Sequence, residues 1–268
     1  MTRDEIVRAI EQRLAGDAVD IARRFQESAS AAGTRHVSIS ELLPRELAAA
    51  IHAQFPSPAS MRRMRSWNER KYTSKNLSST PLLDDATFAF QDPRIVRLVE
   101  RITGMRNMLP DERLYAGGIS AMERGDYLHP HIDNSHDSER LLYRRLNLLY
   151  YITPQWQLDS GGNLELWNEA VTRRVTIPST FNTLVLMETN KRSWHSVSEV
   201  RAEGLRCCIS NYYFSRESPD GGEYFHVTYF SAPPEKPLRR LLAKVDGTAR
   251  TLLRHAKKHG FAPRDYHR

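Results

Sequence analysis

Two histidines and one aspartate are the side chains of this 268-residue chain best suited to hold a metal ion. His131 and Asp133 stand two residues apart, and His195 follows later in the chain. In an extended strand, residues i and i+2 point to the same face, so His131 and Asp133 can reach one ion while Ile132 faces away. Two imidazoles and one carboxylate suit an iron site that keeps coordination positions open for chemistry. The spacing therefore predicts an oxygen-using metalloenzyme.

A buried arginine is the second chemical signal. Arg206 begins the strand-like segment RCCISNYYF (206–214), so Arg206, Cys208 and Ser210 share one face. An arginine that points into a barrel is costly unless an anion meets it. The planar guanidinium can grip one carboxylate through two parallel hydrogen bonds, so we expect a dicarboxylate cosubstrate at this position.

A β-rich framework is needed to bring these residues together. Strand-like segments dominate residues 113–230, and the apolar run 181–187 is typical of a buried strand that opens into a turn before His195. Helices are predicted before this region, over residues 2–15, 17–31 and from 42 or 46 to 54. We expect these helices to pack outside the barrel.

The motifs, in this order, resemble those of the Fe(II)/2-oxoglutarate-dependent dioxygenases, and within them the prolyl-4-hydroxylase-like branch. The matching segments are ERGDYLHPHID (123–133), RRLNLLYYITPQW (144–156), GGNLELW (161–167), His195 and Arg206. The resemblance covers roughly residues 115–230. It implies a mainly β fold with flanking helices, built on a double-stranded β-helix core of the jelly-roll, cupin-like type.

The resemblance also implies roles for individual residues. Fe(II) would be bound by His131, Asp133 and His195. The residues that would surround 2-oxoglutarate are Arg206, Ser210, Tyr151 and Asn147, the last two with ordinary core packing as the alternative. O2 would be the third reactant. The carboxylate of Asp133 favours hydroxylation over halogenation, because related halogenases lack it.

The implied reaction is hydroxylation of an unactivated C–H bond with release of succinate and CO2. The fold does not fix the substrate, because function resides in the site and the loops around it vary. We expect an anionic small molecule or glycolipid, such as an acidic sugar of lipopolysaccharide or a natural-product intermediate. A peptidyl or prolyl hydroxylase and a non-catalytic metal-binding barrel that acts as a sensor or scaffold stay open as alternatives.

A basic stretch over residues 61–72 precedes the core motifs, and we predict a mobile loop that acts as a lid over the site. Its arginines would favour an anionic substrate, while a solvated surface loop is the alternative interpretation. The candidate substrate contacts are Arg62, Arg65, His129, Asn134 and Trp194.

The length of the chain suits a single catalytic domain with helical additions. We expect N-terminal helices packed on the core in residues 1–60, and the basic lid with connecting elements in 61–114. The double-stranded β-helix core would occupy residues 115–230. A basic, helical C-terminal tail would follow in residues 231–268.

The tail carries the positive charge of the chain. Residues 235–268 contain ten Lys or Arg and three Asp or Glu, a net charge of +7 that equals the formal net charge of the whole chain. A basic amphipathic segment can lie on an anionic membrane surface, bind a polyanion, or cap the barrel. Nucleic acid is disfavoured as a partner, because the charge is confined to one terminal segment and does not line a groove.

Export and membrane insertion are not expected from the sequence. No apolar stretch approaches the roughly 20 residues that a membrane-spanning helix needs, and the N-terminal segment does not look like a signal peptide. The two cysteines, Cys207 and Cys208, are adjacent and cannot close an unstrained disulfide. We therefore expect a cytoplasmic protein, with peripheral contact to the inner membrane face through residues 235–268 as one option.

Overall fold

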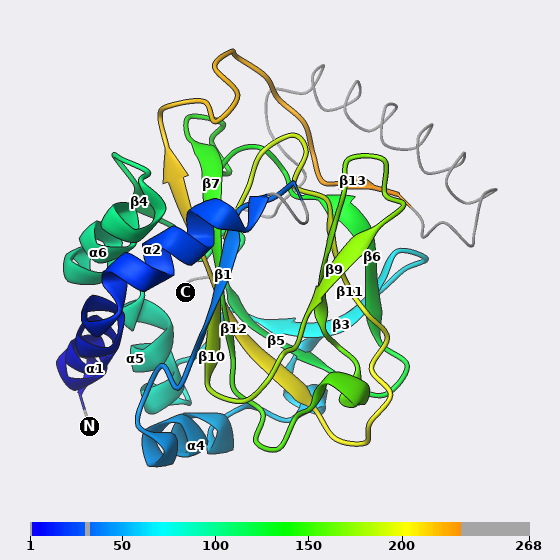
Figure 1. The fold of residues 1–268 in the computed structure, drawn as a ribbon. Coiled ribbons are helices and arrows are strands. Elements are labelled where there is room, and N and C mark those ends of the chain that lie inside the picture. The colour runs from blue at the N-terminus through cyan, green and yellow to red at the C-terminus, as the bar shows by residue number, and fades with distance from the viewer. Residues whose placement is uncertain (1, 30–32, 232–268) are drawn as a thin grey trace.

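A mainly antiparallel β-sheet curls into a nearly closed barrel, and helices cover one side of it (Figure 1). The computed structural model describes residues 2–29 and 33–231 of the chain. The arrangement confirms the predicted fold class, mainly β with flanking helices on a double-stranded β-helix core. The basic, helical tail predicted at residues 231–268, with its optional membrane contact through 235–268, lies outside the described residues apart from residue 231. None of the helices in the described part is long and apolar enough to cross a bilayer.

The helices pack through one apolar face each. They are α1 (Arg3–Gly16), α2 (Ala18–Glu27), α4 (Arg45–Ala53), α5 (Pro81–Ala89) and α6 (Pro93–Thr103). The first three lie close to the ranges predicted from the sequence. Thr2 and Glu5 form a capping box at the start of α1, which satisfies backbone N–H groups that the first turn leaves without partners.

The strands follow one another around the barrel. They are β1 (His36–Ser40), β2 (Arg62–Arg65), β3 (Glu69–Ser74), β4 (Leu109–Pro110), β5 (Gly118–Met122), β6 (Tyr127–Ile132), β7 (Tyr143–Tyr151), β8 (Leu164–Trp167), β9 (Arg174–Ile177), β10 (Thr183–Glu188), β11 (His195–Val197), β12 (Arg206–Ser215) and β13 (Tyr229–Phe230). The pairing order is β1-β10-β7-β12-β5-β3-β6-β11-β8-β9. β2, β4 and β13 pair with β3, β12 and β6, respectively.

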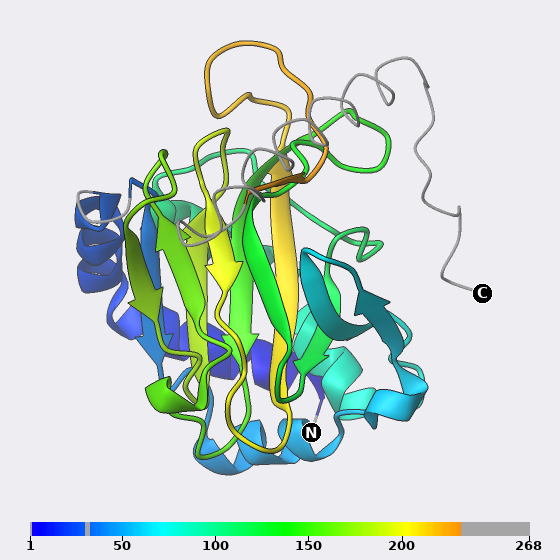
Figure 2. The same ribbon diagram turned by 90° about the vertical axis from the view of Figure 1, so that its right-hand side faces the viewer.

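Strand β3 joins the two walls of the barrel. Its second half pairs with β5 through Tyr72, Thr73 and Ser74, and its first half pairs with β6 through Glu69 and Arg70. One wall therefore contains β1, β10, β7, β12 and β5, and the other contains β6, β11, β8 and β9 (Figures 1 and 2). The barrel interior lies between the two walls.

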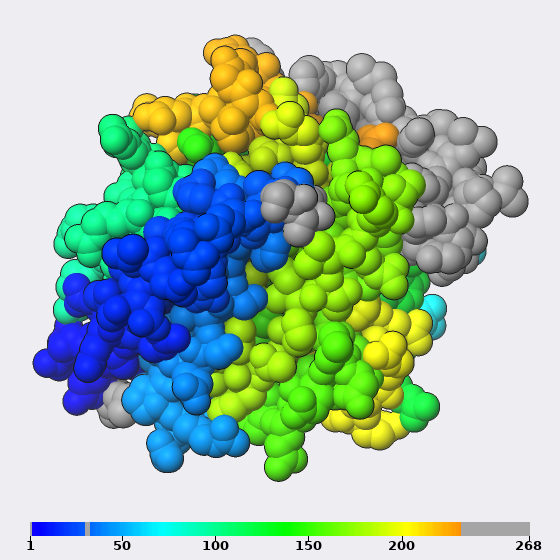
Figure 3. Space-filling model, viewed as in Figure 1, coloured from blue at the N-terminus to red at the C-terminus, as the bar shows by residue number. Residues whose placement is uncertain are grey.

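Alternation along β7 divides the core into two parts. Leu146, Leu148 and Tyr150 face the helices and join the larger apolar cluster. Tyr151 and the half-buried Leu149 point the other way, into the smaller cluster inside the barrel. This period of two is the geometry of a strand that is buried on both faces. The N-terminal helices cover the outer face beside the strands, as the space-filling view shows (Figure 3).

Two segments differ from the sequence prediction. Residues 61–72 were expected to form a loop, but β2 and β3 form a hairpin there, held because β3 pairs with both barrel walls. Residues 1–60 were expected to supply helices that pack on the core, and the structure adds strand β1, which pairs along its whole length with β10. β1 is the edge strand of the wall that contains β10. Its Val37 and Ile39 are buried in the apolar cluster that the helices share.

Candidate metal centre and cosubstrate site

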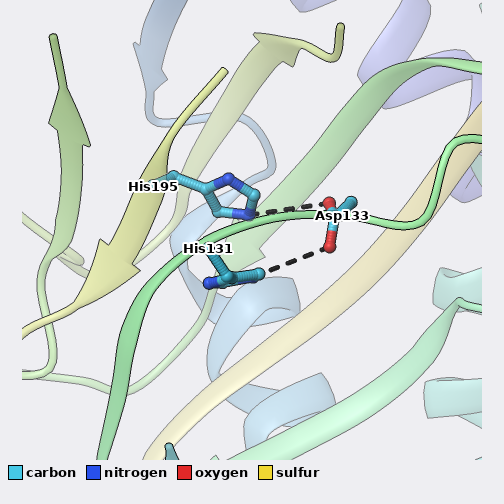
Figure 4. A group of neighbouring side chains, drawn as sticks. All are labelled: His131, Asp133 and His195. Atoms are coloured by element: carbon cyan, nitrogen blue, oxygen red, sulfur yellow. Dashed lines mark ion pairs between the residues drawn. The ribbon is translucent and has the colours of Figure 1, made fainter. Parts of the chain in front are cut away.

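Neighbouring strands bring the three predicted metal ligands together. His131 lies on β6, Asp133 follows the end of that strand, and His195 begins β11. One ligand atom from each of the three lies within 4.8 Å of the others. The Nε2 atoms of His131 and His195 lie 3.6 and 3.5 Å from the two carboxylate oxygens of Asp133 (Figure 4). The side chains converge on one point, as a facial metal site requires.

The other ring nitrogen of each histidine is held by a backbone carbonyl. Nδ1 of His131 lies 2.9 Å from the His129 oxygen, and Nδ1 of His195 lies 2.9 Å from the Ser193 oxygen. A proton on Nδ1 donates to the carbonyl and leaves Nε2 free to bind a metal. Burial lowers the pKa of His195 to about 4, so this imidazole is neutral near pH 7. Both rings are thus oriented as ligands.

Asp133 is ionised and its carboxylate is fixed in place. Burial acts to raise its pKa, but the charge of Arg144 and the interactions with the two histidines hold that pKa well below the usual range. Its Oδ2 atom accepts a hydrogen bond of 2.8 Å from Asn147 Nδ2 and lies 3.0 Å from Nη1 of Arg144. Asn147, which the family resemblance placed near the cosubstrate, therefore contacts a metal ligand.

Arg206 lies inside the barrel with no anionic partner among the described residues. It begins β12, is 4% exposed, and its guanidinium lies 4.6 Å from the ring centroid of Tyr151. Its Nη1 has only a long contact of 3.9 Å with Met122 Sδ. Arg206 Nε and the Tyr151 hydroxyl are buried without hydrogen-bond partners. Burial raises the pKa of Tyr151, so the hydroxyl stays protonated and can donate.

These orphaned polar atoms fit an absent dicarboxylate. Buried polar groups in native proteins nearly always have a partner, so a buried guanidinium whose Nε lacks one, beside a hydroxyl that also lacks one, indicates a ligand. Ser210 lies four residues after Arg206 on the same face of β12, and its Oγ is 3.7 Å from Cys208 Sγ. The residues predicted around 2-oxoglutarate thus line one side of the interior, between Arg206 and the metal ligands.

The residues predicted to touch substrate occupy more varied places. His129 is buried on β6 and stacks on Tyr127 with ring centroids 4.6 Å apart, outside the metal cluster. Asn134 accepts a hydrogen bond from Arg144, and Trp194 lies against the edge of Tyr229. Arg62 and Arg65 are exposed on β2.

Arg144 is the residue of this site that the sequence interpretation did not assign. It lies on β7, and its side chain is 3% exposed. The reasoning that singled out Arg206, that an arginine on a buried strand needs an anion, applies equally to Arg144. Here the anion is the metal ligand Asp133 itself.

Comparisons with known proteins agree with this geometry. A family profile described as the 2OG-Fe(II) oxygenase superfamily matches residues 117–215. A prolyl 3-hydroxylase of Mus musculus is 30% identical over 136 residues, which cover 44% of this chain and 24% of the mouse protein. The match thus spans about a quarter of that relative's length.

Solved structures of prolyl 4-hydroxylases share the fold. One from Phytophthora capsici has a TM-score of 0.57 at 12% identity, covering 91% of this chain and 76% of that chain. One from Pseudomonas putida has a TM-score of 0.52 at 16% identity, covering 74% of this chain and 100% of that chain. At these identities the likeness concerns the fold alone.

The barrel, the His-Asp-His cluster and the family profile lead to one classification. Residues 117–215 match the model of the 2OG-Fe(II) oxygenase superfamily, the family that the motifs predicted, and the barrel and the His-Asp-His cluster agree with that match. The metal and cosubstrate of this superfamily are Fe(II) and 2-oxoglutarate, with O2 as the oxidant. The residues present fit both groups: three converging ligand atoms for the metal, and the unpaired Arg206 and Tyr151 for the carboxylate.

Proposed function

We propose that this protein is a Fe(II)/2-oxoglutarate-dependent dioxygenase that hydroxylates an unactivated C–H bond of an anionic substrate. The observation that carries the proposal is the pairing of the open His131-Asp133-His195 cluster with the buried, unpaired Arg206. In the overall reaction one oxygen atom of O2 enters the substrate C–H bond, and the other enters succinate as 2-oxoglutarate loses CO2. When bound, Fe(II) supplies the activation of O2 that this chemistry needs.

The chain's own residues hold the reactants and exclude water. Asn147 and Arg144 fix the carboxylate of Asp133, and backbone carbonyls fix the two imidazoles, so the ligands need little rearrangement on metal binding. Arg206 would grip the remote carboxylate of 2-oxoglutarate through its planar fork, with Tyr151 and Ser210 as hydroxyl donors. The interior around Tyr151 is apolar, which limits the access of water.

The β2–β3 hairpin supports an anionic substrate. Arg63 and Lys71 of the hairpin are neutralised by Asp126 and Glu69, respectively. Arg62, Arg65 and Arg70 make no ion pair with a described residue, and the hairpin lies beside β6, the strand of His131. A cationic rim of this kind raises the local concentration of anions. Candidate substrates are an acidic sugar of lipopolysaccharide or a natural-product intermediate.

Prolyl hydroxylation is the second candidate. It is favoured by the 30% identity to the mouse prolyl 3-hydroxylase, which is confined to part of that protein. Succinate release measured with acidic sugars and with proline-containing peptides would separate the two. Mass spectrometry of the substrate must show the gain of one oxygen atom. Addition of oxygen to a peptidyl proline, without turnover of any acidic sugar, would favour the prolyl hydroxylase.

The reaction class is tested by anaerobic absorbance. We expect the parent protein with Fe(II) and 2-oxoglutarate to give a visible metal-to-ligand charge-transfer band, which Asp133→Ala and Arg206→Ala weaken. Arg201→Ala is the matched control, because that arginine is exposed and bonds only to the Asp159 carbonyl. Absence of the band in the parent at saturating cosubstrate would leave a metal-binding barrel that serves as a sensor or scaffold.

The hairpin and the tail have separate tests. If the hairpin recognises the substrate, Arg62→Ala plus Arg65→Ala raises KM, whereas an unchanged KM removes that role.

The proposed peripheral contact of residues 235–268 with anionic membranes, which lies outside the described residues, is tested by co-sedimentation with phosphatidylserine vesicles. Equal partitioning of the whole chain and of a chain ending at residue 231 would remove it.

A further inference from the structure

Arg144 places a second buried cation beside the metal ligand Asp133. Its Nη1 lies 3.0 Å from Asp133 Oδ2, and its Nη2 donates a 2.8 Å hydrogen bond to Asn134 Oδ1. The guanidinium lies 4.2 Å from the ring centroid of Tyr212, a residue that faces the same interior. Burial and the pair with Asp133 fix this charge in a position that bulk solvent does not reach.

The charges around the site do not balance once the reactants are bound. Asp133 contributes one negative charge, and Arg144 and Arg206 contribute two positive charges. The imidazoles of His131 and His195 are neutral as metal ligands. A divalent metal and the 2-oxoglutarate dianion cancel each other. One positive charge therefore remains, and a buried charge without a counter-ion is strongly unfavourable.

The neighbouring acidic residue does not supply the missing charge. Asp111 is buried, and its carboxylate accepts hydrogen bonds from the backbone N–H groups of residues 115, 116 and 117. Lys75, which donates to the carbonyl oxygen of Tyr115, lies close enough to Asp111 for their charges to interact. The pair Lys75 and Asp111 is thus neutral as a unit, and the excess charge stays with Arg144.

Unpaired polar atoms near Arg144 mark where a counter-ion can bind. Arg144 Nε and Thr189 Oγ1 are both buried without hydrogen-bond partners. Both residues line a small cavity next to Asp133, together with Ser193, Tyr224 and His226. Polar and apolar atoms both line this partly open cavity, and its space is about that of one water molecule. One oxygen of an anionic group fits such a space, while the rest of a substrate must lie outside it.

We propose that Arg144 is a specificity-determining residue that binds an oxyanion of the substrate, a carboxylate or a phosphate, beside Asp133. The inference rests on the proposed function, because the charge balance includes Fe(II) and 2-oxoglutarate. It deepens that function by giving the anionic substrate a specific partner inside the barrel, in addition to the exposed arginines of the hairpin.

The test uses the full chain loaded anaerobically with Fe(II) and 2-oxoglutarate. The charge-transfer band is followed while acetate or methyl phosphate is added, with sodium chloride at matched ionic strength as the reference. We expect a saturable change of the band in the parent, and the more effective of the two anions identifies the substrate group. In Arg144→Gln the apparent Kd of that anion should rise by about tenfold or more, because a charge-assisted hydrogen bond is lost.

Arg145→Gln is the matched control. It removes the same charge from the next residue of β7, whose Nη1 bonds only to the Glu217 carbonyl, and should change the anion Kd less than about twofold. Arg144→Lys, which keeps the charge, should retain most of the anion affinity. An equal anion affinity in the parent and Arg144→Gln, or a band that does not respond to either anion, would overturn the inference.

The anion affinity separates this role from a merely structural one. If Arg144 only held Asp133 in place, Arg144→Gln would change metal affinity but leave the apparent Kd of the anion unchanged, and the inference would be rejected. Absence of the charge-transfer band in the parent overturns the proposed function and this inference with it, whereas a band without an anion response overturns this inference alone.

Discussion

His131 and His195 are direct partners across the antiparallel pair of β6 and β11, and their ring centroids lie 4.1 Å apart. Backbone pairing therefore sets the separation of two metal ligands that are distant in sequence. A slip of one residue would turn one imidazole to the opposite face of the strand. β11 is also paired with β8 on its other side, with His195 opposite Leu166, which stabilises the register.

Loss of a ligand should abolish tight metal binding. We expect His131→Ala to weaken Fe(II) affinity by more than about 100-fold, since even residues that only support ligands contribute 10–100-fold. His129→Ala is the matched control, because His129 is on the same strand but outside the cluster, and it should change affinity less than about threefold. Anaerobic competition with a chromogenic chelator measures both. Similar losses in the two variants would contradict the assignment of ligands.

The cosubstrate contacts make a separate prediction. Arg206→Lys keeps the charge but loses the planar fork, so 2-oxoglutarate affinity should fall by about tenfold or more while Fe(II) affinity stays the same. Tyr151→Phe keeps the ring under the guanidinium and should lose only the value of one hydrogen bond, about 1 kcal/mol or several-fold in affinity. Calorimetric titration of the metal-loaded protein with 2-oxoglutarate measures both changes. An unaltered affinity in Arg206→Lys would place the carboxylate elsewhere.

The metal ligands and Arg206 could be predicted from the sequence because each depends on local strand geometry. His131 and Asp133 share a face by the period of two, and Arg206 shares one with Ser210. The role of Arg144 could not be read in this way. Simple alternation along β7 would direct it to the helix side with Leu146 and Leu148, yet its guanidinium reaches Asp133. Opposite the step from Tyr213 to Phe214 of β12, β7 has one extra residue between Arg144 and Leu146, and such bulges redirect side chains without a clear sequence signal.

The β2–β3 hairpin shows a second limit of sequence reasoning. Its density of basic residues predicted a mobile lid loop, because the sequence does not distinguish basic residues of a loop from basic residues of an anchored strand. Besides the pairing of β3 with both walls, Asp126 holds the hairpin, because its carboxylate accepts two hydrogen bonds of 2.6 Å from Arg63. That contact joins segments far apart in the chain, and no local pattern encodes it.

The Arg63 and Asp126 pair yields a stability prediction. The side chain of Asp126 is 2% exposed, so Arg63→Ala would leave a buried carboxylate without its counter-ion. Breaking such a pair costs on the order of 3–5 kcal/mol in free energy of unfolding. Arg65→Ala, on the same strand but exposed, should change stability by less than about 0.5 kcal/mol. Urea unfolding of both variants is the measurement, and equal stabilities would show that the pair does not anchor the hairpin.

Gly161 is predicted to be irreplaceable in the turn before β8. Its φ is +75°, and a Cβ there would lie 2.1 Å from the Glu199 carbonyl oxygen. Gly161→Ala should therefore destabilise the protein by at least about 2 kcal/mol, from backbone strain plus a clash with backbone that cannot move aside. Gly125 also has a positive φ, +84°, but nothing lies near its Cβ position. Gly125→Ala should cost only about 1 kcal/mol, and thermal or urea unfolding that ranks the two in reverse order would contradict the packing of this turn.

The buried imidazole of His195 should make the metal-free protein lose stability on mild acidification. Burial lowers its folded-state pKa from 6.5 to about 4, so between these values the unfolded state binds a proton that the folded state does not. The free energy of unfolding therefore falls as pH falls through this window, by roughly 2 kcal/mol between pH 7 and pH 5 from this residue alone. The pKa values of His36, His52, His136 and His226 are also lowered, largely by burial, so the parent alone cannot isolate the effect.

The variant His195→Gln isolates the contribution of His195 to the pH dependence of stability. The contributions of the other histidines cancel when the free energies of unfolding of parent and variant are subtracted. The measurement is urea unfolding with a chelator present. We expect the gap in free energy of unfolding, parent minus variant, to fall by roughly 2 kcal/mol from pH 7 to pH 5. Asp133 does not interfere, since its pKa lies well below this range. A gap that stays constant with pH would mean that the imidazole is not held in its neutral form before the metal binds. The site would then not be preorganised as its geometry indicates.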